Sequence, residues 1–184
     1  FVSGGMGGWL SAMENDPTLQ GYVWQGRQYE GLVCNVAEAV WGFGGELESG
    51  DRVHVDTPEA AAALEHLRSL LEEGISPPGV TSAAEEETRR AFQSGRAVFM
   101  RNWPYAWALL QEEGSPVRGR VGVAALPTRT GVPGAGTLGG WQLGVNAHVS
   151  EKRRAAAAKL VAHLTSQETN VALAISHARI AGPA

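Results

Sequence analysis

The chain has 184 residues, of which 43% are hydrophobic, with a formal net charge of −4 and a pI near 5.7. This is enough apolar material for the core of one domain, or of one domain and a piece of another, and it argues against a disordered chain. The weak negative charge and scattered basic residues leave no footprint for nucleic acid, and the single cysteine, Cys34, excludes an intrachain disulfide and a Cys-based zinc site.

Neither a membrane-spanning run nor a signal peptide is visible in the sequence. The apolar runs are too short to cross a bilayer, and the first residues lack the basic and apolar regions of a signal sequence. Position 1 is Phe and not Met, so we expect a mature product or a fragment of a longer protein. Export therefore stays open.

The start of the chain predicts one strand between two helices. Residues 9–14 indicate a short helix, and residues 21–24 indicate a strand. Apolar residues recur at helical spacing from Leu32 to Trp41, and the glycine-rich residues 42–45 end that helix.

Two helices with strong start signals follow. Thr57, Pro58 and Glu59 have the pattern of an N-cap and a first turn. The side chains predicted to face the core are Ala60, Leu64, Leu67 and Leu71. Residues 82–85 have the spacing of a capping box, which predicts another helix to about residue 94.

A short apolar run at residues 97–100 is typical of a buried strand in a sheet covered on both faces. It stops at the polar residues 101–102. Because Pro104 pushes Trp103 towards extended geometry, we expect this strand to deliver Trp103 and Tyr105 to a sheet edge.

The rest of the chain continues the alternation of helices and strands. The predicted elements are a helix at 107–112, strands at 121–125 and 138–145, a helix from residue 150, and a last helix from a capping box at 165–168 to about residue 176. In the helix from residue 150, Leu160, Val161 and Leu164 are predicted to point inward. The whole order indicates an α/β layered fold with a small, mostly parallel sheet.

The residues after the 97–100 strand also suggest a ligand site, because ligands of open α/β sheets bind at the carboxyl ends of strands. Trp103 offers a flat ring, and Tyr105 offers a ring with a hydroxyl. Arg101 and Asn102 add hydrogen-bond donors, so the group suits a ligand with apolar faces and a hydroxyl-rich rim, such as a sugar. The alternative is that both aromatic side chains pack in the core.

Trp141 is another aromatic residue in a suggestive setting. Gly139 and Gly140 precede it, which lets backbone N–H groups or a ligand come close. Leu143 and Val145 alternate behind it as strand residues. A core position for Trp141 stays the alternative.

Other kinds of site fit less well. Residues 134–139 match G-x-G-x-x-G, but a Pro-rich loop precedes them and strand-like sequence follows, which disfavours a nucleotide site. The five histidines lack metal-ligand spacing, and there is no G-x-S-x-G elbow. Residues 85–87 are acids at a helix start, so we interpret them as a solvated helix end before a site. No metal or cofactor is expected.

Glu30, beside Tyr29, is the candidate for hydrolytic chemistry. A glycoside hydrolase needs two carboxylates at a set separation, and nothing in the sequence pairs Glu30 with Glu46 or Glu48. A structural or sugar-contacting Glu30 is therefore favoured, and we expect no enzyme. A carbohydrate-active hydrolase fragment using Glu30 and a non-catalytic interaction module remain as alternatives.

Three ordered motifs, at residues 21–35, 92–105 and 139–145, resemble the trehalose/maltose-binding members of the family 1 extracellular solute-binding proteins, the receptors of ABC sugar importers. The resemblance implies a single lobe of a periplasmic-binding-protein type II fold, with a small mixed, mostly parallel sheet flanked by helices. It implies that residues 21–184 are a C-terminal sugar-binding lobe whose N-terminal partner lobe is missing. Residues 1–20 would be a Gly-rich lead or a junction.

The resemblance also implies a disaccharide ligand such as trehalose or maltose, an ABC permease as partner, and a periplasmic or lipid-anchored location outside the cytoplasm. The residues that it assigns to the sugar are Trp103, Tyr105, Gly140, Trp141, Tyr29 and Glu30. Trp103 would stack on a sugar ring, beside Tyr105 and Trp141. With half of the polar rim missing, we expect this chain alone to bind sugar weakly or not at all, and to be open to self-association.

Overall fold

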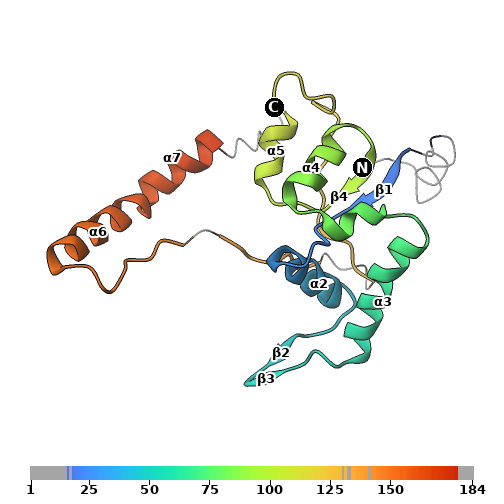
Figure 1. The fold of residues 1–184 in the computed structure, drawn as a ribbon, viewed down its shortest axis with the longest axis horizontal. Helices are drawn as coiled ribbons and strands as arrows, with labels where there is room; N and C mark the ends of the chain where they lie inside the picture. Colours follow the sequence, from blue (N-terminus) through green and yellow to red (C-terminus); the bar gives the residue numbers. More distant parts are fainter. Residues whose placement is uncertain (1–15, 17, 130, 132–133, 141, 178–184) are drawn as a thin grey trace.

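The computed structural model describes residues 16, 18–129, 131, 134–140 and 142–177. Two small sheets lie among helices (Figure 1). Strand β1 (Gln20–Val23) pairs in parallel with β4 (Ala97–Met100), and β2 (Glu48–Ser49) forms an antiparallel hairpin with β3 (Arg52–Val53). The predicted strands at 21–24 and 97–100 are confirmed to within one residue.

The helices separate the strands in sequence. They are α2 (Glu30–Gly42), α3 (Pro58–Glu72), the 3₁₀ helix η1 (Pro78–Ser82), α4 (Glu85–Gln93), α5 (Tyr105–Leu110), α6 (Glu151–Leu164) and α7 (Gln167–His177). In Figure 1, α4 and α5 lie on one side of the β1 and β4 pair, and α2 and α3 lie on the other. The helix predicted at residues 9–14 falls outside the described residues. None of the described helices has both the length and the apolar character needed to cross a bilayer.

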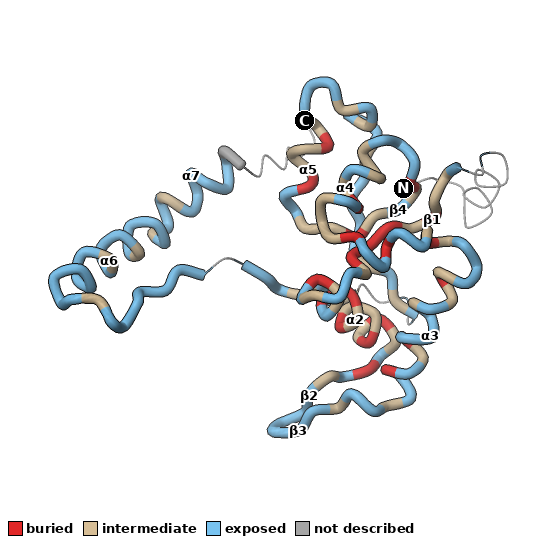
Figure 2. Tube along the Cα trace, in the orientation of Figure 1, coloured by how far each residue is buried: buried red, intermediate tan, exposed pale blue. Residues whose placement is uncertain are grey.

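The parallel pairing of β1 and β4 positions the end of β4. Tyr22 lies opposite Phe99, and Val23 lies opposite Met100. A parallel pair needs a crossover, which α2, α3, η1 and α4 supply. Val23 of β1 and Ala97 of β4 are buried and pack together with Val80 of η1. Figure 2 shows buried residues gathered around this strand pair. Strand β4 is therefore anchored in the core, which fixes the position of the residues that follow it.

Helix α3 begins where the sequence predicts. Thr57 is its N-cap, and its Oγ1 accepts a hydrogen bond from the N–H of Ala60 at 3.2 Å. The predicted stripe is wrong in part, because Leu64 is 51% exposed while Ala63 and Leu70 are buried. Ala60 and Ala63 pack against Val40 of α2, and these short side chains let the two helices approach closely.

The N-cap of α3 gives a direct test of local stability. The change Thr57→Ala should lower the free energy of unfolding by about 1 kcal/mol, because one backbone donor of the first turn loses its acceptor. Thr57→Ser keeps the hydroxyl and should change the free energy little. Urea unfolding monitored by circular dichroism measures both variants, and equal stabilities for Ala and Ser would contradict the role of the cap.

Two predicted capping boxes are placed wrongly. Ser82 closes η1, where its hydroxyl donates to the carbonyl of Gly79, so α4 begins after Ala84. The carboxylate of Glu87 accepts the N–H of Ala84 at 3.0 Å. At α7 the cap is Ser166, whose Oγ accepts the N–H of Thr169, and not the predicted residue one position earlier.

Residues 121–125 and the described part of 138–145 form no strand, which corrects the sequence prediction. Val123 is 80% exposed and Leu138 is 99% exposed. A strand needs a neighbour for its backbone N–H and C=O groups, and no described segment pairs with these residues. These residues therefore have the apolar pattern of a strand, but their backbone pairs with no other described strand.

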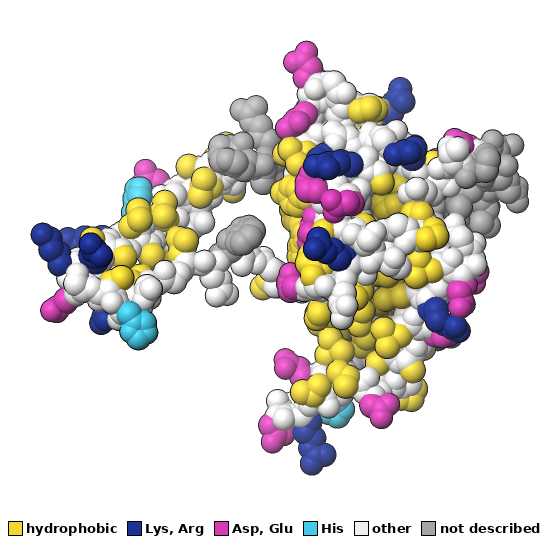
Figure 3. Space-filling view, in the orientation of Figure 1, with side chains coloured by type: hydrophobic (Ala, Val, Ile, Leu, Met, Phe, Trp, Pro, Cys, Tyr) yellow, Lys and Arg dark blue, Asp and Glu magenta, His cyan; other side chains and the backbone are white. Residues whose placement is uncertain are grey.

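Helices α6 and α7 lie apart from the rest of the described chain, at the end of a long extended segment (Figure 1). The prediction that Leu160 and Leu164 point into a core is wrong, because both are exposed, while Val161 is only partly buried. Hydrophobic side chains are visible on the surface of this arm in Figure 3. Helical spacing indicates an apolar face, but it does not say whether this chain covers that face.

Candidate functional site

Trp103 lies just after β4, where two contacts hold its indole ring. The indole Nε1 donates to Oε1 of Glu85 at 3.1 Å, and the guanidinium carbon of Arg101 lies 4.0 Å from the ring centroid. A Cβ atom placed on Gly139 would lie 3.5 Å from two carbons of the ring. The side chain is only partly buried, so it keeps an accessible surface while its orientation is held.

Tyr105, the first residue of α5, is the second aromatic candidate of this region. It is 37% exposed, and its hydroxyl donates to Oε1 of Glu86 at 2.8 Å. Burial, and then the hydrogen bond to Glu86, raise the pKa of Tyr105, so its hydroxyl remains a donor at neutral pH. Trp103 and Tyr105 are therefore both tied by their polar tips to the first turn of α4.

Tyr29 is the N-cap residue of α2 and joins the same group through Glu85. Burial, and then the neighbouring Glu85 carboxylate, raise the pKa of Tyr29. Its phenol lies so close to Gly31 that a Cβ on this glycine would come within 2.2 Å of the hydroxyl oxygen. Only glycine allows this position of the Tyr29 ring.

The structure places Glu30 differently from its neighbour Tyr29. Glu30 is exposed, and its Oε1 accepts a hydrogen bond from Sγ of Cys34, one helical turn along α2, at 3.4 Å. Burial, and then Glu30, raise the pKa of the Cys34 thiol. The Glu30 carboxylate is thus involved with its own helix.

The glycines before Trp141 take two different positions. Gly139 packs on the Trp103 ring, whereas a Cβ on Gly140 would meet no atom within 4 Å, so the backbone of Gly140 is open. Trp141 itself falls outside the described residues. Its proposed place beside Trp103 and Tyr105 stays a prediction.

Arg101 and Asn102 do not offer their donors to a ligand, which corrects the sequence hypothesis. Arg101 is buried and donates to both carboxylate oxygens of Glu38, at 2.8 and 2.6 Å. The Asn102 amide donates to the backbone carbonyl of Glu85 at 3.0 Å, and its Oδ1 accepts the N–H of Trp103 at 2.8 Å. Both side chains therefore hold the fold beneath the aromatic residues.

A buried polar network surrounds the ion pair between Arg101 and Glu38. Gln25 is fully buried, and its amide donates to Thr88 and to the carbonyl of Arg101 at 2.9 Å each. Asn35 donates to Oε1 of Gln25 at 3.1 Å. The network connects β1, α2, α4 and β4 at one point, directly behind Trp103.

Glu38 also ties a distant segment to this network. Its Oε1 accepts the N–H of Thr137 at 3.0 Å, which brings Gly139 to the indole of Trp103. Burial alone would raise the pKa of Glu38, but hydrogen bonds from Arg101 and Thr137 outweigh it, and the pKa lies below 4.5. Glu38 is therefore an anion that joins the segment of Thr137 and Gly139 to the network around Arg101.

Sequence reasoning missed Gln25, Glu38 and Glu85. A signal for Glu38 existed in α2, where Gly31, Asn35, Glu38 and Gly42 fall on one face at helical spacing. Asn35 and Glu38 lie between two glycines on this face, and glycines let another element approach the helix closely. Glu85 has no such signal, because an acid in a first turn is expected in any helix.

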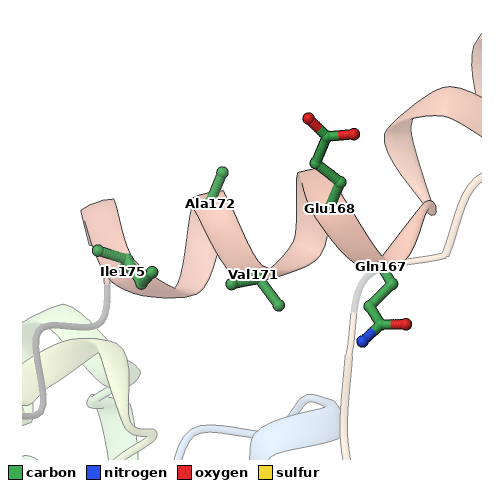
Figure 4. Close-up of a pocket in the computed structure, with 5 residues that line it drawn as sticks. All are labelled: Gln167, Glu168, Val171, Ala172 and Ile175. Carbon is green, nitrogen blue, oxygen red and sulfur yellow. The ribbon is translucent and has the colours of Figure 1, made fainter.

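Two hollows of the described chain lie elsewhere. One has a volume of about 600 Å³ and is lined by α7 alone, with Val171 and Ile175 exposed (Figure 4). The other, of about 620 Å³, lies between α2 and the hairpin of β2 and β3, and Trp41 lines it. The first includes Glu168 beside its apolar side chains, and the second combines Trp41 with Glu46 and Glu48. Neither hollow is lined by Trp103, Tyr105 or Tyr29.

Aromatic side chains at the carboxyl end of a sheet strand in an α/β fold are typical of proteins that bind a small solute. The family model described as bacterial extracellular solute-binding protein matches residues 8–183, and the chain belongs to that family.

Three relatives illustrate the family. A protein of Deinococcus radiodurans named "Probable ABC transporter-binding protein" is 44% identical over 157 residues, which cover 84% of this chain and 37% of that protein. The structure of maltose-bound MalE3 from T. maritima is 46% identical with a TM-score of 0.83, over 91% of this chain and 43% of that one. A solute-binding protein of an ABC transporter from Agrobacterium radiobacter, in complex with ribitol, has a TM-score of 0.76 at 23% identity, over 89% and 41% of the two chains.

These comparisons confirm the fold class, which is the α/β type II fold of solute-binding proteins, with a small parallel sheet among helices. The chain spans less than half of the length of each of the three relatives.

Proposed function

We propose that this chain is the C-terminal lobe of an extracytoplasmic sugar receptor for an ABC importer. The observation that carries the proposal is the indole of Trp103, which is held by Glu85 and Arg101 and is still partly exposed at the carboxyl end of β4. The 46% identity with maltose-bound MalE3 supports a sugar as the ligand, and the chain's share of its relatives' length supports one lobe of a larger receptor.

The preferred ligand is a disaccharide, with maltose first and trehalose second. A ring stacked on Trp103 would gain about 0.5–1.5 kcal/mol beyond its buried area, whereas a buried hydroxyl without a partner would cost roughly 1–3 kcal/mol. Stacking therefore supplies general affinity, and the polar groups around the rings select the sugar. Tyr105 and Tyr29 would flank the sugar, Gly140 would bring open backbone close to it, and Trp141 would complete the aromatic wall.

The receptor would work by closing two lobes on the sugar and presenting the closed form to a membrane permease. A ligand shifts such an equilibrium only through contacts that differ between the open and closed forms, so both lobes must touch it. Membership of a solute-binding family supports binding without catalysis, and we assign no reaction to Glu30.

A titration of the chain with maltose and trehalose tests the proposal. The indole N–H resonances of the six tryptophans report binding, after assignment by single Trp→Phe variants. We expect the Trp103 resonance to move with a dissociation constant of about 1 mM, equivalent to roughly −4 kcal/mol, because one lobe supplies only part of the polar rim. Micromolar affinity would contradict the assignment of a single lobe, and no movement with either sugar would contradict the sugar ligand.

A further inference from the structure

The carboxylate of Glu85 is placed differently from the other acids of α4. It belongs to the first turn of the helix and is only partly exposed, and its Oε1 accepts the indole N–H of Trp103 at 3.1 Å. The same carboxylate is near enough to the Tyr29 hydroxyl to raise the pKa of Tyr29, although that hydroxyl makes no hydrogen bond of normal geometry. Glu85 therefore acts on two aromatic residues that come from separate parts of the sequence.

Glu85 carries a charge without a close cation. Burial raises its pKa, but the nearby Tyr29 hydroxyl, hydrogen bonds from its own backbone N–H and from Trp103, and the charge of Arg101 outweigh it, so the pKa lies below its ordinary value. Among the described residues, Glu85 makes no salt bridge, whereas its neighbour Glu86 pairs with Arg89 at 2.7 Å. The N-terminus of α4 favours the negative charge of Glu85.

An ionised carboxylate has about four acceptor positions and no donor. The Trp103 indole occupies one of these positions and the backbone N–H of Glu85 another, while the Tyr29 hydroxyl makes no hydrogen bond of normal geometry. The carboxylate lies at the Nε1 edge of the Trp103 ring, and a pyranose stacked on that ring carries its hydroxyls around its own edge. The groups that match such an acceptor are hydroxyl donors of the sugar.

From this arrangement we infer that Glu85 is a specificity-determining residue of the sugar site, whose carboxylate accepts a hydrogen bond from one hydroxyl of the sugar stacked on Trp103. The inference rests on the proposed function and adds to it the residue that selects the ligand. Glu85 holds the indole through one contact and reads a hydroxyl through another. A residue that only held the indole would affect all sugars of similar shape equally.

A cycle between protein and ligand variants tests this difference. The ligands are maltose and a set of its monodeoxy derivatives, each lacking one hydroxyl, and the proteins are the unchanged chain and Glu85→Ala. In the unchanged chain we expect one derivative to bind roughly tenfold more weakly than maltose, as for a lost hydrogen bond to a charged group. In Glu85→Ala that derivative and maltose should bind equally, while the differences at the other positions persist.

Two further variants sharpen the test. Glu85→Gln keeps an acceptor for the indole and should retain part of the selectivity. Glu59→Ala removes an exposed first-turn acid from α3 and should leave the ligand profile unchanged, which controls for a general loss of charge at a helix start.

The outcomes separate the inference from the proposed function. A uniform loss of affinity in Glu85→Ala for every ligand, or no change for any, would overturn the specificity role while leaving the sugar site in place. No binding of maltose by the unchanged chain would overturn the sugar site, and the role of Glu85 with it.

Discussion

Replacing Arg101 with methionine is expected to lower the free energy of unfolding by about 3–5 kcal/mol, because it leaves the buried charge of Glu38 without its partner. The two side chains are 5% and 7% exposed, and the guanidinium reaches both carboxylate oxygens. Arg101 also bonds to Gln25, so its loss opens the network where β1, α2 and β4 meet. Urea unfolding followed by circular dichroism measures the change.

A matched surface cation provides the control. Arg68 pairs with Glu65 and Glu72 on α3, but its side chain is 60% exposed, so Arg68→Met should change stability little. The double variant Glu38→Gln, Arg101→Met should lose less than the sum of the two single variants, because it leaves no lone charge behind. Equal effects at Arg101 and Arg68 would contradict the central place of the buried pair.

The largest effect on binding is expected from Trp103→Ala. The substitution removes a stacking surface that Glu85 and Arg101 hold in place, so we expect affinity for maltose to fall at least about tenfold, by roughly 1.4 kcal/mol. The indole lies above Arg101 and not within the main core cluster, so the fold should persist. Binding is measured through the backbone amide resonances of residues 137–140, and thermal unfolding verifies the fold.

Two comparisons define what Trp103 contributes. Trp103→Phe keeps a flat ring but loses the donor to Glu85, and its affinity should fall between that of the unchanged chain and that of Trp103→Ala. Trp41→Ala removes an indole from the hollow beside the hairpin and should leave maltose affinity as it was. If Trp41→Ala lowers maltose affinity as much as Trp103→Ala does, the assignment of the sugar site to Trp103 is contradicted and a site at α2 is indicated.

Local signals predicted those parts of the fold that depend on neighbours in sequence. The apolar run at 97–100 became β4, and Thr57 caps α3, because strand length, capping and turn chemistry are set within a few residues. The predictions of strands at 121–125 and in the described part of 138–145 were wrong, because a strand needs a hydrogen-bonded partner strand that the sequence pattern does not identify. The prediction that Leu160 of α6 points inward was wrong for the same reason, because helical spacing identifies an apolar face but not the element that covers it.

In the candidate site, too, local sequence predicted some residues, whereas others depend on contacts between distant parts of the chain. Trp103 and Tyr105 are recognisable from a strand that ends in aromatic residues, and the structure keeps both partly exposed. The assignment of Arg101 as a ligand donor was wrong, because its partner Glu38 lies 63 positions earlier in the chain and only folding brings them together. Glu85 was missed for the same reason, since its contact with Trp103 crosses between α4 and the end of β4.

Intermolecular nuclear Overhauser effects show whether the sugar lies on the indole of Trp103. With the chain held in excess maltose, we expect effects between the ring protons of Trp103 and the CH protons of one sugar ring. If maltose binds and its protons show effects only to another tryptophan, such as Trp41, the sugar does not lie on Trp103.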